Sequence, residues 1–400
     1  MNSTRRSVKM RSLCHKVVFN IAVILIMALS SGFAADKKPH SASPPVQISK
    51  KWRIGYLEGG NYKDYQKVLI ATVEGLIGMG WIEKMSIPEQ ENKEDNSNLW
   101  AWLAANAKSK YLEFAADAYY SDNWKTDRRE QTKKILLSRL KEARDIDLML
   151  ALGTWAGQDL ANNGHSVPTV VCSVTDPITS KIVKSVSDSG YDHVHARLDP
   201  TRYERQVRSF HEVIGFKKLG VAFEDTEVGR SYAAMSDIEK IAKERKFGIV
   251  PCHFKAHDVS KEDAEAGLIK CAGELAPKID AFYMTSSSGM TPKSLPKILE
   301  PMTAHKIPTF SQTGIDDVKR GVLLSVSQQQ NFKYVGMFQA QIIAKIINGA
   351  KPRDLEMVYE TPVKSAFNAA VAKKIGLKPE IYDLLLRSSV EIYKETEGDK

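Results

Sequence analysis

The sequence has few cysteines and lacks the short motifs that mark common classes of enzyme. Four cysteines occur among 400 residues, and no CxxC pair or Cys/His cluster has the spacing of a metal site. GxSxG, HExxH and P-loop motifs are absent, and no GxGxxG lies between a strand and a helix. We therefore expect no catalytic residues, no metal and no cofactor, and the pattern argues against an enzyme.

Long apolar runs are also scarce, and the clearest one lies near the N-terminus, at Val17–Leu29. It follows a basic segment without acidic residues, and it precedes small residues that end at Ala34 and Ala35. This order is typical of a secretory signal peptide over residues 1–35, cleaved near Ala34 or Ala35. An uncleaved anchor is the alternative, but the run is short of the roughly 20 apolar residues that span a bilayer. We therefore expect a periplasmic protein whose mature chain has no membrane span.

The excess of positive over negative charge is small once residues 1–35 are excluded. Five of the 57 Lys and Arg residues and none of the 48 Asp and Glu residues fall in residues 1–35, so the formal charge drops from +9 to +4. The remaining charges of both signs are interspersed, as on solvated helix faces, and no nucleic-acid partner is expected.

What the chain does contain is an alternation of short apolar runs with longer amphipathic ones. This alternation is typical of βαβ units with a mostly parallel sheet, and the chain is long enough for two domains. Three strand-and-loop segments recur in the same order, since 53–60, 147–154 and 167–175 resemble 219–226, 280–287 and 307–313. The repeat predicts two α/β, Rossmann-like lobes. Residues 36–50 are polar and contain three prolines, so they are expected to form a flexible leader.

Glycine and small hydroxyl residues gather where the predicted strands end. Ligands bind outside the carboxyl ends of parallel strands, next to free backbone N–H groups, so these loops predict a shared ligand site between the lobes. Helix capping by Ser and Thr is the alternative for any single loop. Trp155 follows such a loop, and we expect its ring to line the site. The loops are Gly59-Gly60, Gly153-Thr154, Ser173–Asp176, Thr226 and Thr285–Ser288.

Three further features allow alternatives. Cys252 and Cys271 can pair in an oxidising compartment, but the sequence does not show that they meet. Residues 81–108 hold three of the six tryptophans and form either a partner surface or, as we favour, a helix packed on the first lobe. His193 and His195 alternate on a predicted strand and are expected at the surface.

Four segments, 150–158, 167–178, 280–287 and 318–323, resemble the ABC-transporter substrate-binding family that includes tryptophan- and tyrosine-uptake proteins. The resemblance runs from about Lys51 to Pro379. It implies a type I periplasmic-binding fold, in which two lobes joined by three crossovers enclose a ligand. It also implies an ABC permease and an ATPase on other chains as partners. We place lobe 1 at 51–198 plus 330–350, and lobe 2 at 199–329 plus 351–400.

The resemblance also assigns the ligand loops. The expected function is capture of a small polar or amino-acid-like ligand, including an aromatic one, for an ABC importer. A ligand-sensing subunit for a membrane receptor is the alternative, and an exported enzyme is less favoured. The family usually has proline where this chain has Trp155, and the loop 311–317 is one residue longer than usual. The expected ligand-binding residues are Glu58, Gly59, Tyr62, Thr154, Trp155, Ala156, Ser173, Thr175, Asp176, Asp225, Thr226, Ser231, Thr285, Ser286, Ser287, Gln312, Thr313 and Asp316.

Overall fold

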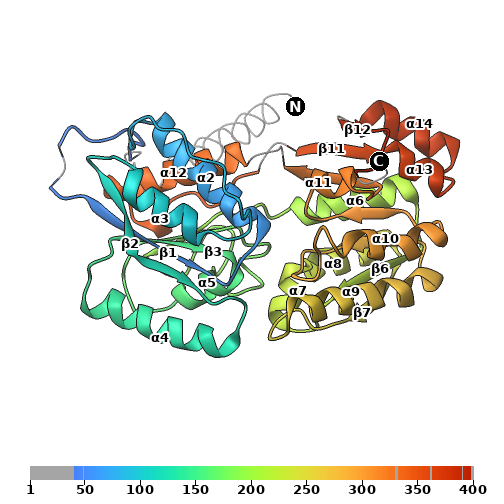
Figure 1. Ribbon diagram of the computed structural model, residues 1–400, viewed down its shortest axis with the longest axis horizontal. Coiled ribbons are helices and arrows are strands. Elements are labelled where there is room, and N and C mark those ends of the chain that lie inside the picture. The colour runs from blue at the N-terminus through green and yellow to red at the C-terminus, as the bar shows by residue number, and fades with distance from the viewer. Residues whose placement is uncertain (1–39, 48, 329–331, 361–362, 390, 398–400) are drawn as a thin grey trace, which may run out of the picture. The chain divides into compact units, whose positions relative to one another are not determined.

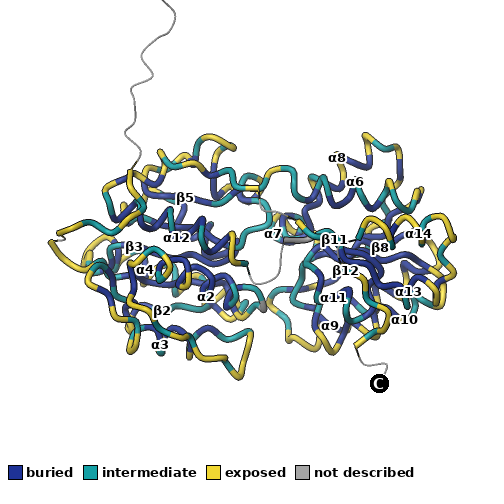
Figure 2. The backbone as a smooth tube through the Cα atoms, turned by 90° about the horizontal axis from the view of Figure 1, so that it is seen from above, coloured by how far each residue is buried: buried dark blue, intermediate teal, exposed yellow. Residues whose placement is uncertain are grey.

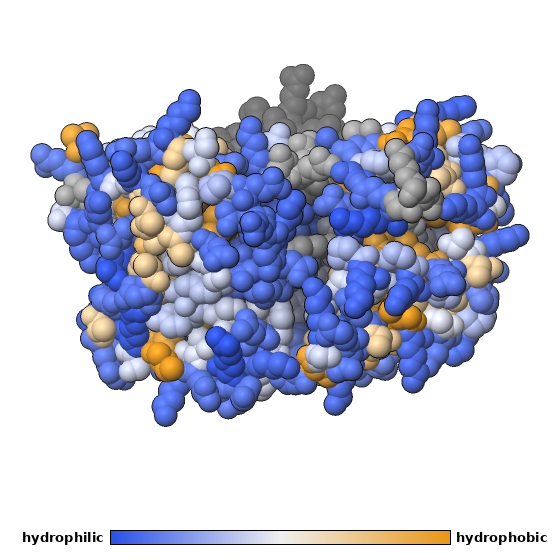
Figure 3. Space-filling view, viewed as in Figure 1, coloured by the Kyte–Doolittle hydropathy of each residue, from blue (hydrophilic) through white to orange (hydrophobic). Residues whose placement is uncertain are grey.

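Two β-sheets organise the chain. The computed structural model describes residues 40–47, 49–328, 332–360, 363–389 and 391–397, and residues 41–400 form one compact unit (Figure 1). The buried residues run through both sheets (Figure 2), whereas hydrophilic side chains predominate on the face shown in Figure 3. The predicted signal peptide lies outside the described residues. Within those residues, no helix has the length and apolar character that a membrane crossing requires.

The first sheet has five parallel strands in the order β2-β1-β3-β4-β5. Its central strands β3 and β4 are buried on both faces because helices cover both faces of the sheet, as is usual for parallel sheets. The strands are β1 (Trp52–Glu58), β2 (Leu112–Ser121), β3 (Leu148–Leu152), β4 (Thr169–Cys172) and β5 (Val194–Ala196). The helices are α2 (Lys63–Gly78), α3 (Ser97–Asn106) and α12 (Lys333–Ile347) on one face, and α4 (Thr126–Glu142) and α5 (Gly153–Leu160) on the other.

The second sheet has the order β12-β11-β10-β9-β8-β6-β7, and its neighbours are parallel except for β10 and β11. The strands are β6 (Lys218–Phe223), β7 (Gly248–His253), β8 (Ala281–Met284), β9 (Thr309–Ser311), β10 (Leu324–Gln328), β11 (Val363–Asn368) and β12 (Glu391–Tyr393). One face packs against α6 (Arg202–Ile214), α8 (Met235–Arg245), α13 (Ala369–Lys374) and α14 (Pro379–Ser388). The other packs against α9 (Lys261–Leu275), α10 (Leu295–Ala304) and α11 (Ile315–Lys319). Shorter elements are α7 (Glu227–Tyr232), η1 (Ala276–Lys278) and η2 (Pro352–Asp354).

The chain passes between the two sheets three times: after β5, after β10 and before β11. This topology confirms the predicted α/β fold with two lobes and three crossovers. Residues 351–359, which we placed with the second lobe, contact the first. The Tyr359 N–H donates to the Leu198 carbonyl at 2.9 Å, and the Arg353 guanidinium pairs with Asp188 at 2.9 Å.

The structure also decides the three open features. Cys252 and Cys271 form a disulfide between β7 and α9. Trp81 and Trp100 are fully buried in the first lobe, and the Trp100 indole N–H donates to the Ala115 carbonyl, which confirms packing of an added helix. The surface assignment of His193 and His195 was wrong, because His193 packs against the ring of His165 and His195, in β5, packs against Phe338 of α12.

Glycine allows α12 to approach α2 closely, and Figure 1 shows the two helices side by side. A Cβ atom on Gly336 would lie 2.2 Å from the backbone carbon of Ala71 and 2.5 Å from its Cβ atom. A buried hydrogen bond from the Thr72 hydroxyl to the Gln339 amide oxygen, 2.7 Å long, also joins the two helices. The first lobe therefore depends on a helix that follows most of the second lobe in the chain.

We predict that Gly336→Ala destabilises the protein by about 1–3 kcal/mol, because the added methyl group meets backbone that cannot move aside cheaply. Chemical denaturation measures the effect. Gly273→Ala on α9 is the matched control, since a Cβ atom there meets nothing within 4 Å. A Gly336→Ala protein as stable as the control would contradict the close helix contact.

Candidate functional site

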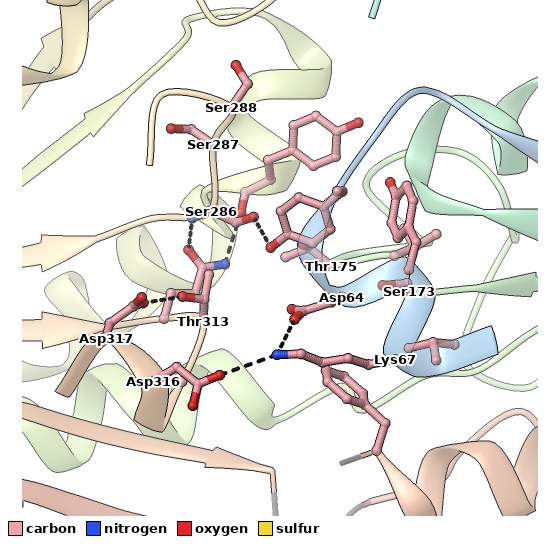
Figure 4. Close-up of a pocket in the computed structure, with 18 of the residues that line it drawn as sticks. Asp64, Lys67, Ser173, Thr175, Ser286, Ser287, Ser288, Thr313, Asp316 and Asp317 are labelled. Atoms are coloured by element: carbon pink, nitrogen blue, oxygen red, sulfur yellow. Dashed lines mark hydrogen bonds and ion pairs between the residues drawn. The ribbon is translucent and has the colours of Figure 1, made fainter. Parts of the chain in front are cut away.

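The loops that follow the strands of both sheets enclose a cavity of about 610 Å³ (Figure 4). It lies where the carboxyl ends of the two parallel sheets face each other, which is the position predicted from the hydroxyl-rich loops. Of the residues expected to bind ligand, those that line it are Tyr62, Ser173, Thr175, Ser286, Ser287, Gln312, Thr313 and Asp316. Sequence reasoning thus identified loops from both walls.

Two polar contacts cross the cavity from one lobe to the other. The Tyr62 hydroxyl and the Ser286 hydroxyl are 3.0 Å apart. Lys67 on α2 pairs with Asp316 on α11 at 3.3 Å and with Asp64 at 3.7 Å, as Figure 4 shows. The side chains that bond across the space are polar and partly exposed, so a ligand can compete for the same groups.

Trp124 forms the wall at the β2 end of the cavity. Its backbone N–H donates to the Gly59 carbonyl at 2.8 Å, and its indole N–H donates to the Asn61 carbonyl at 3.0 Å. Cβ atoms on Gly59 and Gly60 would lie 2.8 and 2.6 Å from its ring, and Gly60 has a φ of +151°. The two glycines therefore admit the Trp124 ring, where the sequence had suggested that they admit a ligand.

Trp155 lies behind this wall and does not line the cavity. It is 4 % exposed, its ring stacks on His257 at 5.5 Å, and its edge faces Trp124 at 5.6 Å. The guanidinium of Arg129 also lies over this ring, 4.7 Å from its centre. His257 lines the cavity from the second lobe, with its Nδ1 atom against the carboxylate of Glu224. Trp155 thus supports the rings that reach the cavity.

Glu58 is a structural carboxylate rather than a cavity residue. It is 0 % exposed and accepts hydrogen bonds from the Tyr56 hydroxyl (2.7 Å), the Asn96 amide (2.8 Å) and the Tyr119 hydroxyl (2.9 Å). Burial raises the pKa of Glu58, and the three hydrogen bonds oppose that rise. Its role is to join β1, β2 and the segment before α3.

The other expected residues also have roles within the fold. Buried Ser231 bonds to the Ser180 hydroxyl at 2.5 Å, and buried Thr285 donates to the Ala222 carbonyl. Exposed Thr226 caps α7, and exposed Asp225 pairs with Arg230 at 3.4 Å. The Asp176 carboxylate accepts hydrogen bonds from the backbone N–H groups of Ile178 and Thr179 and so caps a turn. Thr154 and Ala156 are buried at the start of α5.

Sequence reasoning missed several lining residues because they follow no repeated pattern. Trp124 lies outside the repeated strand-and-loop segments, and Arg197 and Arg202 lie in the first crossover and at the start of α6. Their isolated positions give no periodic signal, although two arginines flanking a predicted crossover were visible in the sequence. The lining residues missed are Asp64, Tyr65, Lys67, Trp124, Arg197, Arg202, Tyr203, Phe223, Glu224, Tyr232 and His257, among others.

Comparison with known proteins finds a matching protein family and a curated relative. The family model for ABC transporter substrate binding proteins matches residues 115–391. A tyrosine-binding protein from Clostridioides difficile strain R20291 is 21% identical over 336 residues, which cover 78% of this chain and 93% of that protein.

Solved structures with a similar fold cover most of the chain. An ABC domain from Streptococcus pneumonia in complex with L-Trp has a TM-score of 0.61 and 18% identity, and covers 85% of this chain and 99% of that one. A ligand-free, open substrate-binding protein from Clostridium difficile has a TM-score of 0.55 and 17% identity, and covers 86% of this chain and all of that one (100%). These likenesses confirm the type I periplasmic-binding fold.

We predict that Glu58→Gln lowers the free energy of unfolding by about 1–3 kcal/mol, because the amide N–H group replaces an acceptor that buried donors require. Urea denaturation measures the loss. Glu113→Gln on the neighbouring strand is the control, since its side chain is 43% exposed and its ion pair with Arg53 is long. Equal stability of the two variants would contradict a structural role for Glu58.

Proposed function

Because the chain belongs to the family of ABC transporter substrate-binding proteins, we propose that it captures a small solute outside the cytoplasmic membrane for an ABC importer. The two lobes enclose the solute and deliver it to a permease, which works with an ATPase, both on other chains. The observation that carries this proposal is the cavity at the facing carboxyl ends of the two sheets. The predicted signal peptide supports the extracytoplasmic location.

The chemistry of the cavity favours a ligand with a polar end and a flat apolar part. Hydroxyls line its middle, and the Ser287 hydroxyl is buried without a hydrogen-bond partner in the described chain, so it can serve a ligand. Rings of Trp124, Tyr232 and His257 line the β2 end. The relatives that bind tyrosine or tryptophan make aromatic amino acids the first solutes to test.

Native mass spectrometry of freshly purified full-length chain tests the proposal. We expect one small molecule per chain, released on denaturation. Calorimetric titration with L-tyrosine and L-tryptophan, and with D-glucose as a solute without an aromatic ring, then ranks the candidates. A protein that carries no solute and binds none of a broad panel of amino acids and aromatic acids would overturn the proposed function.

We predict that Trp124→Ala weakens binding of the co-purified solute by roughly thirtyfold, about 2 kcal/mol, because an aromatic contact and apolar area are both lost. Trp155→Ala removes a buried ring and should mainly lower the melting temperature. Trp102→Ala on α3, partly buried and outside the cavity lining, is the control for loss of a tryptophan. Near wild-type affinity in Trp124→Ala would remove Trp124 from the site.

A further inference from the structure

Two arginines line the cavity without a carboxylate partner. In the part of the chain that the structure describes, no Asp or Glu oxygen lies within 4.0 Å of the guanidinium of Arg197 or Arg202. The Arg197 guanidinium donates to the Tyr359 carbonyl at 2.9 Å. The Arg202 Nε atom is buried without a hydrogen-bond partner, and its guanidinium lies 5.0 Å from the centre of the Tyr203 ring.

Other arginines on the same helix show that this arrangement is unusual for the chain. Arg205 pairs with Asp199 at 3.0 Å, and Arg208 pairs with Glu244 at 2.8 Å. The charges of Asp199 and, next among the carboxylates, Asp64 act on Arg202. Asp199 is paired with Arg205, and Asp64 lies 3.7 Å from Lys67. On α6, the arginines outside the cavity therefore have a carboxylate partner, whereas Arg202, which lines the cavity, has none within 4.0 Å among the described residues.

Both guanidiniums remain charged at neutral pH. Burial, and next the charge of Arg202, lower the pKa of Arg197 to about 10, which is still far above 7. Burial opposes the charged form of Arg202, but neighbouring groups, Tyr203 and then Asp199, raise its pKa. The planar guanidinium is the side chain best suited to grip a carboxylate with two parallel hydrogen bonds. The fold therefore keeps a positive charge where a bound anion can neutralise it.

The strand order places this charge opposite the aromatic wall. Trp124 follows β2 and Arg197 follows β5, the two edge strands of the first sheet. Four strand spacings, roughly 19 Å, separate these two edge strands. Arg202, five residues further along the chain, lines the same cavity and lies close enough to Arg197 for its charge to lower the pKa of Arg197. The cavity thus has an aromatic end and a cationic end.

We infer that Arg197 and Arg202 bind a carboxylate of the ligand, so that the solute is an organic acid or a zwitterion with its apolar part toward Trp124. This inference rests on the proposed function and adds the charge of the ligand and the residues that select it. The hydroxyls of Ser173 and Thr175, which follow the neighbouring strand β4, supply further donors beside Arg197.

Charge-matched pairs of solutes test the inference. The full-length chain is titrated with L-tyrosine and L-tyrosinamide, L-tryptophan and L-tryptophanamide, and 3-phenylpropionate and 3-phenylpropionamide. The solute released from purified protein is analysed for a carboxylate. We expect the carboxylate to bind about 10- to 100-fold more tightly than its amide in at least one pair.

Variants assign that preference to the arginines. Arg202→Gln should reduce the carboxylate-to-amide ratio to near one, and Arg202→Lys should keep part of it, because the charge remains without the planar fork. Arg208→Gln on the outer face of the same helix is the control and should keep the wild-type ratio. If Arg202→Gln fails to fold by circular dichroism, the ratio is measured in Arg202→Lys and Arg197→Lys, and both should lie below wild type.

The outcomes separate this inference from the proposed function. Tight binding of amides or neutral solutes with no preference for the carboxylate would overturn the inference and leave solute capture standing. A wild-type ratio in folded Arg202→Gln, or in both lysine variants, would equally overturn it. A chain that binds no solute of any charge would overturn both.

Discussion

The contact between α2 and α12 is the interaction on which the site depends. The N-terminal end of α2 presents Tyr62, Asp64 and Lys67 to the cavity, and the position of the helix is set by the helix packed across it. Gly336 and Gly75 bring the two backbones together, since a Cβ atom on Gly75 would lie 2.8 Å from that of Ala340. A small shift of α12 would therefore move three cavity residues at once.

The cavity wall at the β2 end is built in layers rather than from single contacts. Asp159 holds Arg129 at 2.8 Å, Arg129 covers Trp155, and Trp155 supports Trp124 and His257. Each layer is fixed by a side chain that is itself packed or bonded, which keeps the rings at the cavity ordered without a ligand. At the opposite end, no carboxylate of the described chain pairs with Arg197 or Arg202 as Asp159 pairs with Arg129. The two ends therefore differ in apolar area and in charge.

The sequence was sufficient for the fold and for some of the loops that line the cavity. Alternating apolar and amphipathic runs and the repeated strand ends predicted the two sheets, and small hydroxyls predicted loops such as Ser173–Thr175 and Ser286-Ser287. It failed where a residue's role depends on long-range packing. Glu58 ends a strand like a ligand residue, but Tyr119 and Asn96, far along the chain, enclose it. Trp155 and Trp124 could not be told apart, because which ring reaches the cavity is decided by how β2 and β3 lie relative to β1.

The late position of α12 in the chain has a consequence for the order of folding. The core of the first lobe includes residues of α12 such as Phe338 and Ile343, whereas strands β6 to β10 lie together in one stretch of the sequence. Contacts between α2 and α12 span more than 250 residues, as from Thr72 to Gln339, a separation of 267. Such contacts have high contact order and form slowly, because the long intervening chain must first be brought together. The lobe that leaves the ribosome first thus cannot complete its core until α12 has emerged, after most of the second lobe, and until then its apolar sheet face is open to chaperones and to aggregation.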